Sequence, residues 1–233
     1  VDPLYSISLY AGLGQLGKNY PVQLIEPADN LDYNTPENVE ALESASSVII
    51  CAGFDTETEK ENHDRTFTLP EGQDAMIKFA AAHNSNVIAV IYSGGGFDMS
   101  AWKDDVKAII MGWYPGQEGG LALARMLAGE FSPSGRLPMS IEACWEDNPV
   151  HDSYYTKEKA ENKRGFTNRY VTYNEGVFMG YRGYDRLGTK PLYPFGYGLT
   201  YGDFEYSDLA VVPSGDGVDV KFTLTNNGKM AAA

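Results

Sequence analysis

Three apolar runs, each nearly continuous in Val, Ile and Ala, constrain the fold of this chain most strongly. They occupy residues 47–52, 86–92 and 106–113. Strands that are buried on both faces of a parallel sheet have this composition, whereas half-exposed strands alternate apolar and polar residues. Helical patterns at 72–82 and 118–128 lie between and after the runs. Strand alternating with helix predicts an α/β domain with a mostly parallel sheet.

The segments before and after these runs predict further elements. Asp2 followed by proline is typical of a helix start, so we expect a helix from Asp2 to Gly17, then a strand over 20–25 and a helix over 35–45. Beyond Phe204, apolar and polar residues alternate on both sides of a turn at 214–217, which predicts an antiparallel hairpin. Two strands do not make a stable sandwich alone, so we expect this hairpin to open a β-sandwich whose remainder is absent.

Composition divides the chain into three parts. Residues 1–142 contain the alternating strands and helices, and residues 204–233 contain the hairpin. Residues 143–203 between them are rich in Tyr, Gly, Asn and charged side chains and show little helical periodicity. We therefore expect an α/β domain, an irregular connecting segment packed on it, and the first strands of a β-domain.

The charge balance disfavours several kinds of partner. Thirty-two acidic and 18 basic side chains give the 233 residues a formal net charge of -14. Nucleic acids and anionic membrane surfaces attract basic proteins, so neither is an expected partner. No apolar stretch reaches the roughly 20 residues of a spanning helix, and the first residues lack the pattern of a signal peptide. These features leave the compartment open between secreted, periplasmic and cytoplasmic.

Cysteine and glycine patterns do not identify a cofactor. Cys51 and Cys144 are too few for a disulfide scaffold and lack the spacing of metal ligands. A G-x-G-x-x-G pattern at 12–17 follows a helical pattern instead of a strand, which argues against dinucleotide binding. Glycine-rich stretches at 93–96 and 115–120 follow strand runs and suit either tight turns or ligand-facing loops. Neither stretch contains a Walker motif or a Gly-x-Ser-x-Gly elbow.

An acidic loop follows the first strand run, at the strand end where ligand sites gather in parallel α/β sheets. It spans residues 55–65 and holds five acids together with Lys60 and His63. One interpretation is a solvated surface loop with a salt bridge between Asp64 and Arg65, because charge runs are usually exposed. The other is that one carboxyl, with its pKa raised by partial burial and like-charged neighbours, acts as a general acid.

Motifs along much of the chain favour the catalytic interpretation, because together they resemble one family. The stretch Glu61-Asn62-His63-Asp64-Arg65, followed by Leu69-Pro70 and Gln73, resembles the Glu-Gly-x-Asp-Arg…Leu-Pro…Gln segment of family 3 glycoside hydrolases, the β-glucosidase family. Further stretches agree with this family in the same order, at residues 93–95, 113–120, 133–138, 173–176, 180–182 and 193–201. The tail after Phe204 resembles the start of the fibronectin type III-like domain that follows in many members.

The resemblance implies a three-layer α/β sandwich with a mostly parallel six-stranded sheet, placed against the mouth of a (β/α)8 barrel. In this family the barrel supplies the aspartate nucleophile and most sugar contacts, while the sandwich domain supplies the acid/base glutamate in many members. That glutamate corresponds to Glu61, and Glu59 is the rival two residues earlier. Nothing in the chain resembles the barrel, so we expect half of a two-carboxylate mechanism and no activity from the chain alone. The resemblance implies no cofactor and no metal.

Other residues are expected to support the site. Asp64 and Arg65 are better suited to anchoring the loop than to contacting sugar. Trp102 and Tyr114 lie near strand ends, where they would form an aromatic platform for the leaving group or pack in the core or at an interface. Asn62 stands where the family has glycine, a position suited to a positive backbone φ, and Asn tolerates such a φ better than most residues.

The sequence therefore predicts part of a retaining β-glycosidase that acts on an oligosaccharide or a β-glucoside. A β-glucosidase that removes terminal non-reducing β-D-glucosyl residues is favoured, and such enzymes hold their two carboxyls about 5–5.5 Å apart. Two alternatives stay open. One is a β-xylosidase of the same family, and the other is a non-catalytic carbohydrate-binding or scaffold fragment that acts only with a barrel from elsewhere. The sequence does not fix the oligomeric state, and it is compatible with a homo-oligomer.

Overall fold

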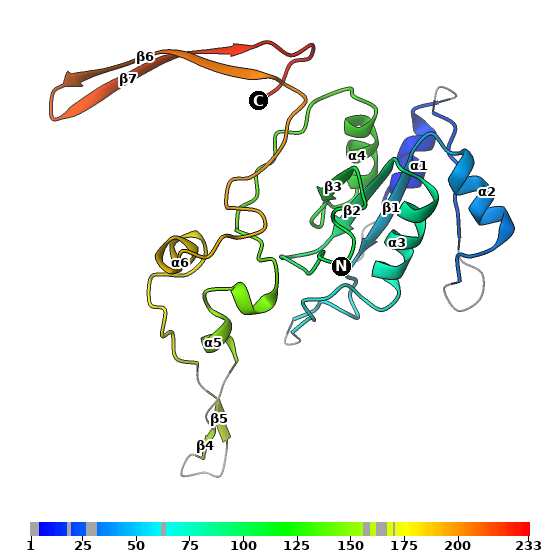
Figure 1. Cartoon of the computed structure of the whole chain (residues 1–233), viewed down its shortest axis with the longest axis horizontal. Coiled ribbons are helices and arrows are strands. Elements are labelled where there is room, and N and C mark those ends of the chain that lie inside the picture. Colours follow the sequence, from blue (N-terminus) through cyan, green and yellow to red (C-terminus); the bar gives the residue numbers. More distant parts are fainter. Residues whose placement is uncertain are drawn as a thin grey trace. The chain divides into compact units, whose positions relative to one another are not determined.

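The computed structural model describes residues 5–17, 20–26, 32–61, 64–155, 159–161, 167–169 and 171–233. The chain forms two compact units. The hairpin unit falls within residues 1–22, 116–136 and 197–233, and the sheet unit falls within residues 23–115 and 137–196. The sheet unit contains the parallel sheet and the acidic loop, and the hairpin unit contains the two long C-terminal strands (Figure 1). The division into residues 1–142, 143–203 and 204–233 stays a prediction.

The sheet unit is built on three parallel strands, β1 (Val48–Gly53), β2 (Val87–Tyr92) and β3 (Ala108–Met111), in the order β1-β2-β3. The prediction of a parallel α/β sheet is confirmed, although the described residues contribute three strands to it, fewer than the six expected. The central strand β2 is the most buried, with Val90 at 0% exposure. Strand β1 exposes Cys51, and β3 has no fully buried residue, because each forms an edge of the described sheet.

Two helices pack beside this sheet. Helix α2 (Pro36–Ser44) begins after Thr35, whose hydroxyl accepts the backbone N–H of Asn38 at 3.2 Å, and it lies beside α3. Helix α3 (Gln73–His83) connects β1 to β2, packs against both strands and buries Ile77 completely. Both helices were predicted within one or two residues. The buried core around them comprises Leu42, Val48, Ile50, Ala52, Phe54, Leu69, Ile77, Ala80, Val87, Ala89, Ile91, Phe97, Met99, Trp102 and Ile141.

The helices of the hairpin unit are α1 (Leu9–Gln15) and α4 (Gly119–Leu127), which pack against each other. Helix α4 agrees with the predicted range, whereas α1 starts at a Ser8 cap, later than the predicted Asp2, which lies outside the described residues. A Cβ atom on Gly12 would overlap the Gly120 carbonyl, so these glycines allow the two helices to approach closely. The G-x-G-x-x-G pattern therefore has a packing role in this structure.

The predicted strand over residues 20–25 is wrong, since the described residues there form no strand. A short extended segment becomes a strand only when another strand pairs with it, and local propensity cannot supply that partner.

Short elements interrupt the segment after residue 143, where the sequence predicted an irregular connection. They are a 3-10 turn (Trp145–Asp147), α5 (His151–Tyr154), β4 (Lys159–Glu161) paired antiparallel with β5 (Thr167–Arg169), and α6 (Tyr181–Leu187). Gly180 and Gly188, both with positive φ, bound α6 on its two sides. The helices have one or two turns and the strands have three residues each, which is too short for periodicity to predict.

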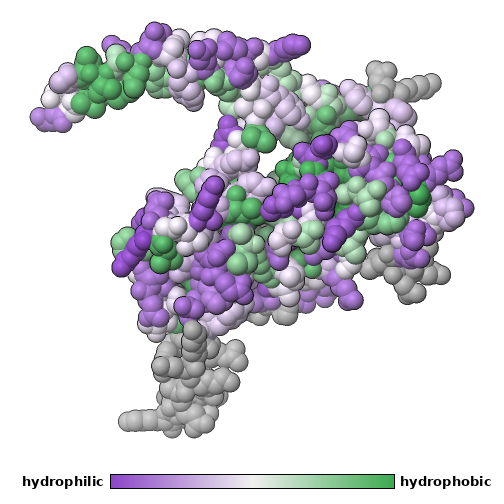
Figure 2. Space-filling model, viewed as in Figure 1, coloured by the Kyte–Doolittle hydropathy of each residue, from purple (hydrophilic) through white to green (hydrophobic). Residues whose placement is uncertain are grey.

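The hairpin consists of β6 (Phe204–Ser214) and β7 (Gly217–Asn226), joined by the two-residue turn Gly215-Asp216. Its antiparallel pairing and turn are as predicted. Apolar side chains gather on it and are exposed, as Figure 2 shows near its turn. Those at least half exposed are Tyr206, Leu209, Val211, Val218, Val220, Phe222 and Leu224. No helix in the described parts of either unit is long and apolar enough to cross a membrane.

Candidate active site

The acidic loop begins with a tight turn directly after β1. Oδ1 of Asp55 accepts hydrogen bonds from the Thr58 hydroxyl at 2.8 Å and from the backbone N–H groups of Thr58 and Glu57 at 2.9 and 3.0 Å. These bonds, led by the one from the Thr58 hydroxyl, lower the pKa of Asp55. Short acidic side chains stabilise turns in this way. Beyond the turn, the chain carries Glu59 back toward the edge of the sheet.

Glu59 is the centre of a hydrogen-bonded network at that edge. Its Oε2 accepts the Tyr114 hydroxyl at 2.6 Å and the backbone N–H of Gly94 at 3.2 Å, and it lies 3.5 Å from Nε of Arg65. We call these four residues the Glu59 network. They come from the segments that follow β1, β2 and β3, which meet at the carboxyl ends of the strands. The Glu59 side chain is only 25% exposed, so its carboxylate is committed to contacts within the chain.

Arg65 fastens the end of the loop to the chain after β2. One guanidinium nitrogen donates to the Gly96 carbonyl and another to the Thr66 carbonyl at 3.1 Å, while the guanidinium lies 4.7 Å from the centre of the Phe54 ring. The salt bridge expected between Asp64 and Arg65 is not among the ion pairs of the described residues. Arg65 pairs with Glu59 instead, because the fork of the guanidinium faces the sheet edge.

The glycine-rich stretch after β2 forms the surface on which these side chains rest. A Cβ atom on Gly94 would overlap Oε1 of Glu59, and one on Gly95 would lie 2.7 Å from Nη2 of Arg65. Ser93 is fully buried, and its hydroxyl donates to the Gly95 carbonyl at 2.8 Å. Glycine is needed here because charged side chains lie directly on the backbone. Of the two alternatives left by the sequence, this stretch is a close-packed turn that holds the Glu59 network.

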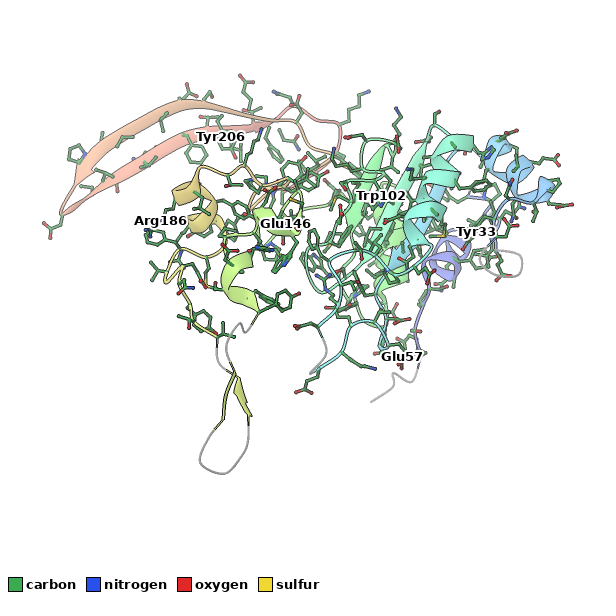
Figure 3. All side chains as sticks on the ribbon, turned by 60° about the horizontal axis from the view of Figure 1, so that its bottom comes forward. Tyr33, Glu57, Trp102, Glu146, Arg186 and Tyr206 are labelled. Carbon is green, nitrogen blue, oxygen red and sulfur yellow. The ribbon has the colours of Figure 1, made fainter. Side chains whose placement is uncertain are left out.

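The two aromatic residues predicted near the site have different surroundings. Tyr114 is 54% exposed, and burial of its hydroxyl, followed by its bond to the Glu59 carboxylate, raises the pKa of Tyr114 to about 12. Trp102 is 1% exposed, and its Nε1 donates to Asp74 at 2.7 Å. Its ring stacks on Phe97 among the packed side chains of the sheet unit (Figure 3). Trp102 therefore offers no face to a sugar in this structure, and we assign it to the core.

Glu61 differs from Glu59 in every contact. It is exposed, and it makes no hydrogen bond or ion pair with the described part of the chain. Glu57, earlier in the loop, pairs with Lys60 at 3.4 Å, and 83% of its side chain is exposed (Figure 3). Asn62 and His63 lie outside the described residues. Asp64 accepts the hydroxyl of Tyr154 at 3.4 Å, so the loop beyond Glu61 contacts the segment after residue 143.

Sequence reasoning missed this last contact and the rings around it. Trp145 packs edge-on against Tyr154, with 5.2 Å between ring centroids, and Tyr155 follows directly. The available signal was the high aromatic content of residues 143–203, which carries no information about what the rings contact. No group of three side chains suited to a metal ion occurs among the residues that the structure describes.

Comparisons with known proteins match most of the chain to one family. The family model described as "Glycosyl hydrolase family 3 C-terminal domain" matches residues 1–181. The protein named "Probable beta-glucosidase I" from Aspergillus terreus is 38% identical over 204 residues, which cover 83% of this chain and 23% of that protein. "Thermostable beta-glucosidase B" from Acetivibrio thermocellus is 38% identical and covers 99% of this chain and 30% of its own length.

A relative with a different name and a solved structure extend the comparison. "Exo-alpha-(1->6)-L-arabinopyranosidase" from Bifidobacterium longum is 37% identical, with 90% of this chain and 26% of that protein covered. The crystal structure of the GH3 beta-glucosidase from Bifidobacterium adolescentis superimposes with a TM-score of 0.81 and 32% identity, over 97% of this chain and 33% of that one. The chain thus spans about a quarter to a third of the length of these relatives.

Proposed function

The chain belongs to glycoside hydrolase family 3, and from this premise we propose that it supplies the general acid/base of a retaining β-glucosidase. The substrate would be an oligosaccharide or β-glucoside with a terminal non-reducing β-D-glucosyl residue. The names of the relatives from Aspergillus terreus and Acetivibrio thermocellus support glucose as the sugar. The relative named as an arabinopyranosidase carries the name of a different sugar, so a specificity other than glucose stays an alternative. Within the family, the alternative is β-xyloside hydrolysis.

The observation that carries the proposal is the contrast between two glutamates on one loop. Glu59 is held by Tyr114, Gly94 and Arg65, so its carboxylate cannot reach a glycosidic oxygen without breaking the network. Glu61, two residues further along the loop, is exposed and has no polar partner among the described residues. It also occupies the position of the acid/base glutamate in the family pattern. We therefore assign the acid/base role to Glu61 and an anchoring role to Glu59.

In the proposed mechanism, the Glu61 carboxylic acid donates its proton to the glycosidic oxygen while an aspartate attacks the anomeric carbon. The bond to the leaving group breaks, and a glycosyl-enzyme intermediate forms. The Glu61 carboxylate then takes a proton from water, which attacks the same carbon and releases the sugar. The aspartate would come from a (β/α)8 barrel in the part of the enzyme that this chain does not cover. The chain alone would therefore be inactive.

A surface of the sheet unit suits contact with that barrel. The segment before and within α6 exposes large apolar side chains, among them Tyr173 at 70%, Val177 at 63% and Leu187 at 63%. Tyr181 is 49% exposed, and its ring lies 5.1 Å from that of Phe195. Exposed apolar area of this kind usually marks a contact surface. We propose that this segment packs on the barrel, whether the barrel lies on the same chain or a separate one.

Replacement of Glu61 in the complete enzyme tests the assignment. Glu61→Ala should lower kcat/KM for cellobiose by about 10²- to 10⁴-fold, the usual contribution of general acid/base catalysis. The variant's kcat/KM should fall far less for a substrate with a good leaving group, such as 2,4-dinitrophenyl β-glucoside. The dinitrophenolate of this substrate departs with little need for protonation. Azide should speed turnover of this variant by attacking the glycosyl intermediate, and the product would be glucosyl azide.

Glu57→Ala is the matched control, because Glu57 is an exposed acid in the same loop. It should behave like the parent enzyme with both substrates. Full activity of Glu61→Ala on cellobiose would exclude Glu61 as the acid. If Glu59→Ala instead showed azide rescue, the roles of the two glutamates would be exchanged.

A further inference from the structure

Five aromatic rings gather beside the acidic loop, and the proposed acid/base role does not use them. Trp145 lies at the centre of this group, which we call the aromatic cluster. Its ring centroid lies 5.2 Å from Tyr154 and 6.4 Å from Tyr155, both nearly edge-on. It also lies 5.7 Å from His151 and 6.2 Å from Phe67. Edge-to-face contacts of this kind hold rings in defined orientations.

Two rings of the aromatic cluster are open to solvent. Tyr154 is 44% exposed and Tyr155 is 55% exposed, and the two rings meet edge to face at 4.9 Å. An exposed ring that is already fixed by its neighbours loses little conformational freedom when a ligand binds. The cluster therefore has the properties of a preorganised surface for a flat or ring-shaped ligand.

The cluster is fastened to the same loop as Glu61. The Tyr154 hydroxyl donates to Oδ1 of Asp64 at 3.4 Å. Burial, and then the negative charge of Asp64, raises the pKa of Tyr154, so this hydroxyl stays protonated at neutral pH. Asp64 is three residues beyond Glu61, and three residues of chain span at most about 11 Å. The open rings thus lie on a segment that contacts the loop three residues beyond the proposed acid.

The position of the acid determines which part of a substrate these rings would meet. Glu61 would protonate the glycosidic oxygen, which departs with the leaving group, whereas the nucleophile attacks the sugar that stays behind. Surfaces that adjoin the acid on its own domain therefore border the leaving group. We propose that Tyr154 and Tyr155, braced by Trp145, bind the ring of the leaving group in the assembled enzyme, either a second sugar or an aryl aglycone. This inference rests on the role proposed for Glu61.

The test compares leaving groups of different size in the complete enzyme. Tyr155→Ala should raise KM for cellobiose and for 4-nitrophenyl β-glucoside by roughly 2- to 12-fold relative to its effect on β-glucosyl fluoride, as expected for the loss of one aromatic contact. Fluoride is too small to reach the rings, so it reports on the rest of the site. Tyr155→Phe keeps the ring, so its KM values for the three substrates should stay close to those of the parent enzyme.

Controls separate binding from folding and from assembly. Tyr206→Ala removes a 69% exposed tyrosine from the hairpin, outside the proposed surface, and should leave the ratios between the three substrates unchanged. Equal effects of Tyr155→Ala on all three substrates, or no effect, would overturn the proposal that the aromatic cluster binds the leaving group. So would a change in oligomeric state by light scattering without a change in the ratios, which would mean that a second copy covers the rings. Glu61→Ala on the same substrates tests the acid separately, because it acts on kcat and its dependence on the leaving group.

Discussion

Glu59 and Glu61 lie two residues apart in the acidic loop, yet their surroundings are opposite. The Asp55 turn and the Glu59 network hold the first part of the loop against the sheet edge through hydrogen bonds and an ion pair. Glu61, between Glu59 and the clamp at Arg65, is left open. Hydrogen bonds and an ion pair thus hold the loop at Glu59 and at Arg65, whereas the Glu61 carboxyl has no polar partner among the described residues. An acid that must meet a substrate from outside the domain requires this kind of support.

The largest effect on this contrast is expected from Arg65→Ala. The change leaves the Glu59 carboxylate three-quarters buried without its cation and removes the donor to the Gly96 carbonyl. The acidic loop should therefore lose its attachment to the sheet edge. We expect a loss of about 2–3 kcal/mol in the free energy of unfolding, measured by denaturant titration. In the complete enzyme, kcat should fall roughly 100-fold, because a displaced loop misplaces the acid. Arg65→Lys keeps the charge but not the forked guanidinium, so its stability and its kcat should lie between those of the parent and of Arg65→Ala.

Parent-like stability and activity in Arg65→Ala would show that the open and anchored parts of the loop are independent. The positioning role of Arg65 would then be wrong, while the assignment of Glu61 would stand.

A smaller effect is expected from Tyr114→Phe, which removes one donor to Glu59 and keeps the ring. The loss should be about 1 kcal/mol or less, since the tyrosine is half exposed. The pH dependence has a defined sign. The pKa of Tyr114 is raised to about 12, above its value of about 10 in an unfolded chain, so its contribution is complete below about pH 10 and is lost as the pH rises toward 12.

Thermal unfolding of parent and variant between pH 8 and 12 measures this contribution. The two melting temperatures should converge at the alkaline end. A constant gap across the range would mean that the hydroxyl does not stabilise the folded state through Glu59.

The smallest effect is expected at Asp55, which is fully exposed. Hydrogen bonds lower its pKa in the folded state, so its stabilisation is present above the ordinary carboxyl pKa of about 3.9 and is lost as the pH falls through the folded value. Asp55→Asn should flatten the fall of the melting temperature between pH 5 and pH 2, and Thr58→Ala should do so partly. If the melting temperature of Asp55→Asn fell as steeply with pH as that of the parent, the Asp55 turn would not help to anchor the loop.

Much of the fold could be predicted from the sequence because its elements have strong local signals. The three parallel strands, the helices α2, α3 and α4, and the hairpin turn at 215–216 all lie within a few residues of the expected ranges. The strand expected at 20–25 failed, and the short elements after residue 143 were missed. Both errors have one cause, since short segments take their conformation from partners far away in sequence.

The candidate site was predictable in its location but only partly in its contacts. The strand ends after β1, β2 and β3 were expected to meet, and the bonds from Tyr114 and Gly94 to Glu59 join them. The salt bridge between Asp64 and Arg65, which belonged to one of two interpretations of the loop, is not among the ion pairs of the described residues. Trp102, for which the sequence allowed a sugar platform or core packing, lies in the core. Residue type identifies a side chain as charged or aromatic, whereas its partner depends on how the segments are brought together.

The sequence by itself determined the parallel α/β sheet and the family, through continuous apolar runs and a series of motifs that need no knowledge of contacts. The family motif favoured Glu61 over Glu59, but only the tertiary structure showed how the contacts of these two identical side chains differ. The physical reason is that a carboxylate becomes an anchor or stays free according to the donors around it. Those donors, Tyr114, Gly94 and Arg65, come from different segments of the chain that only folding brings together.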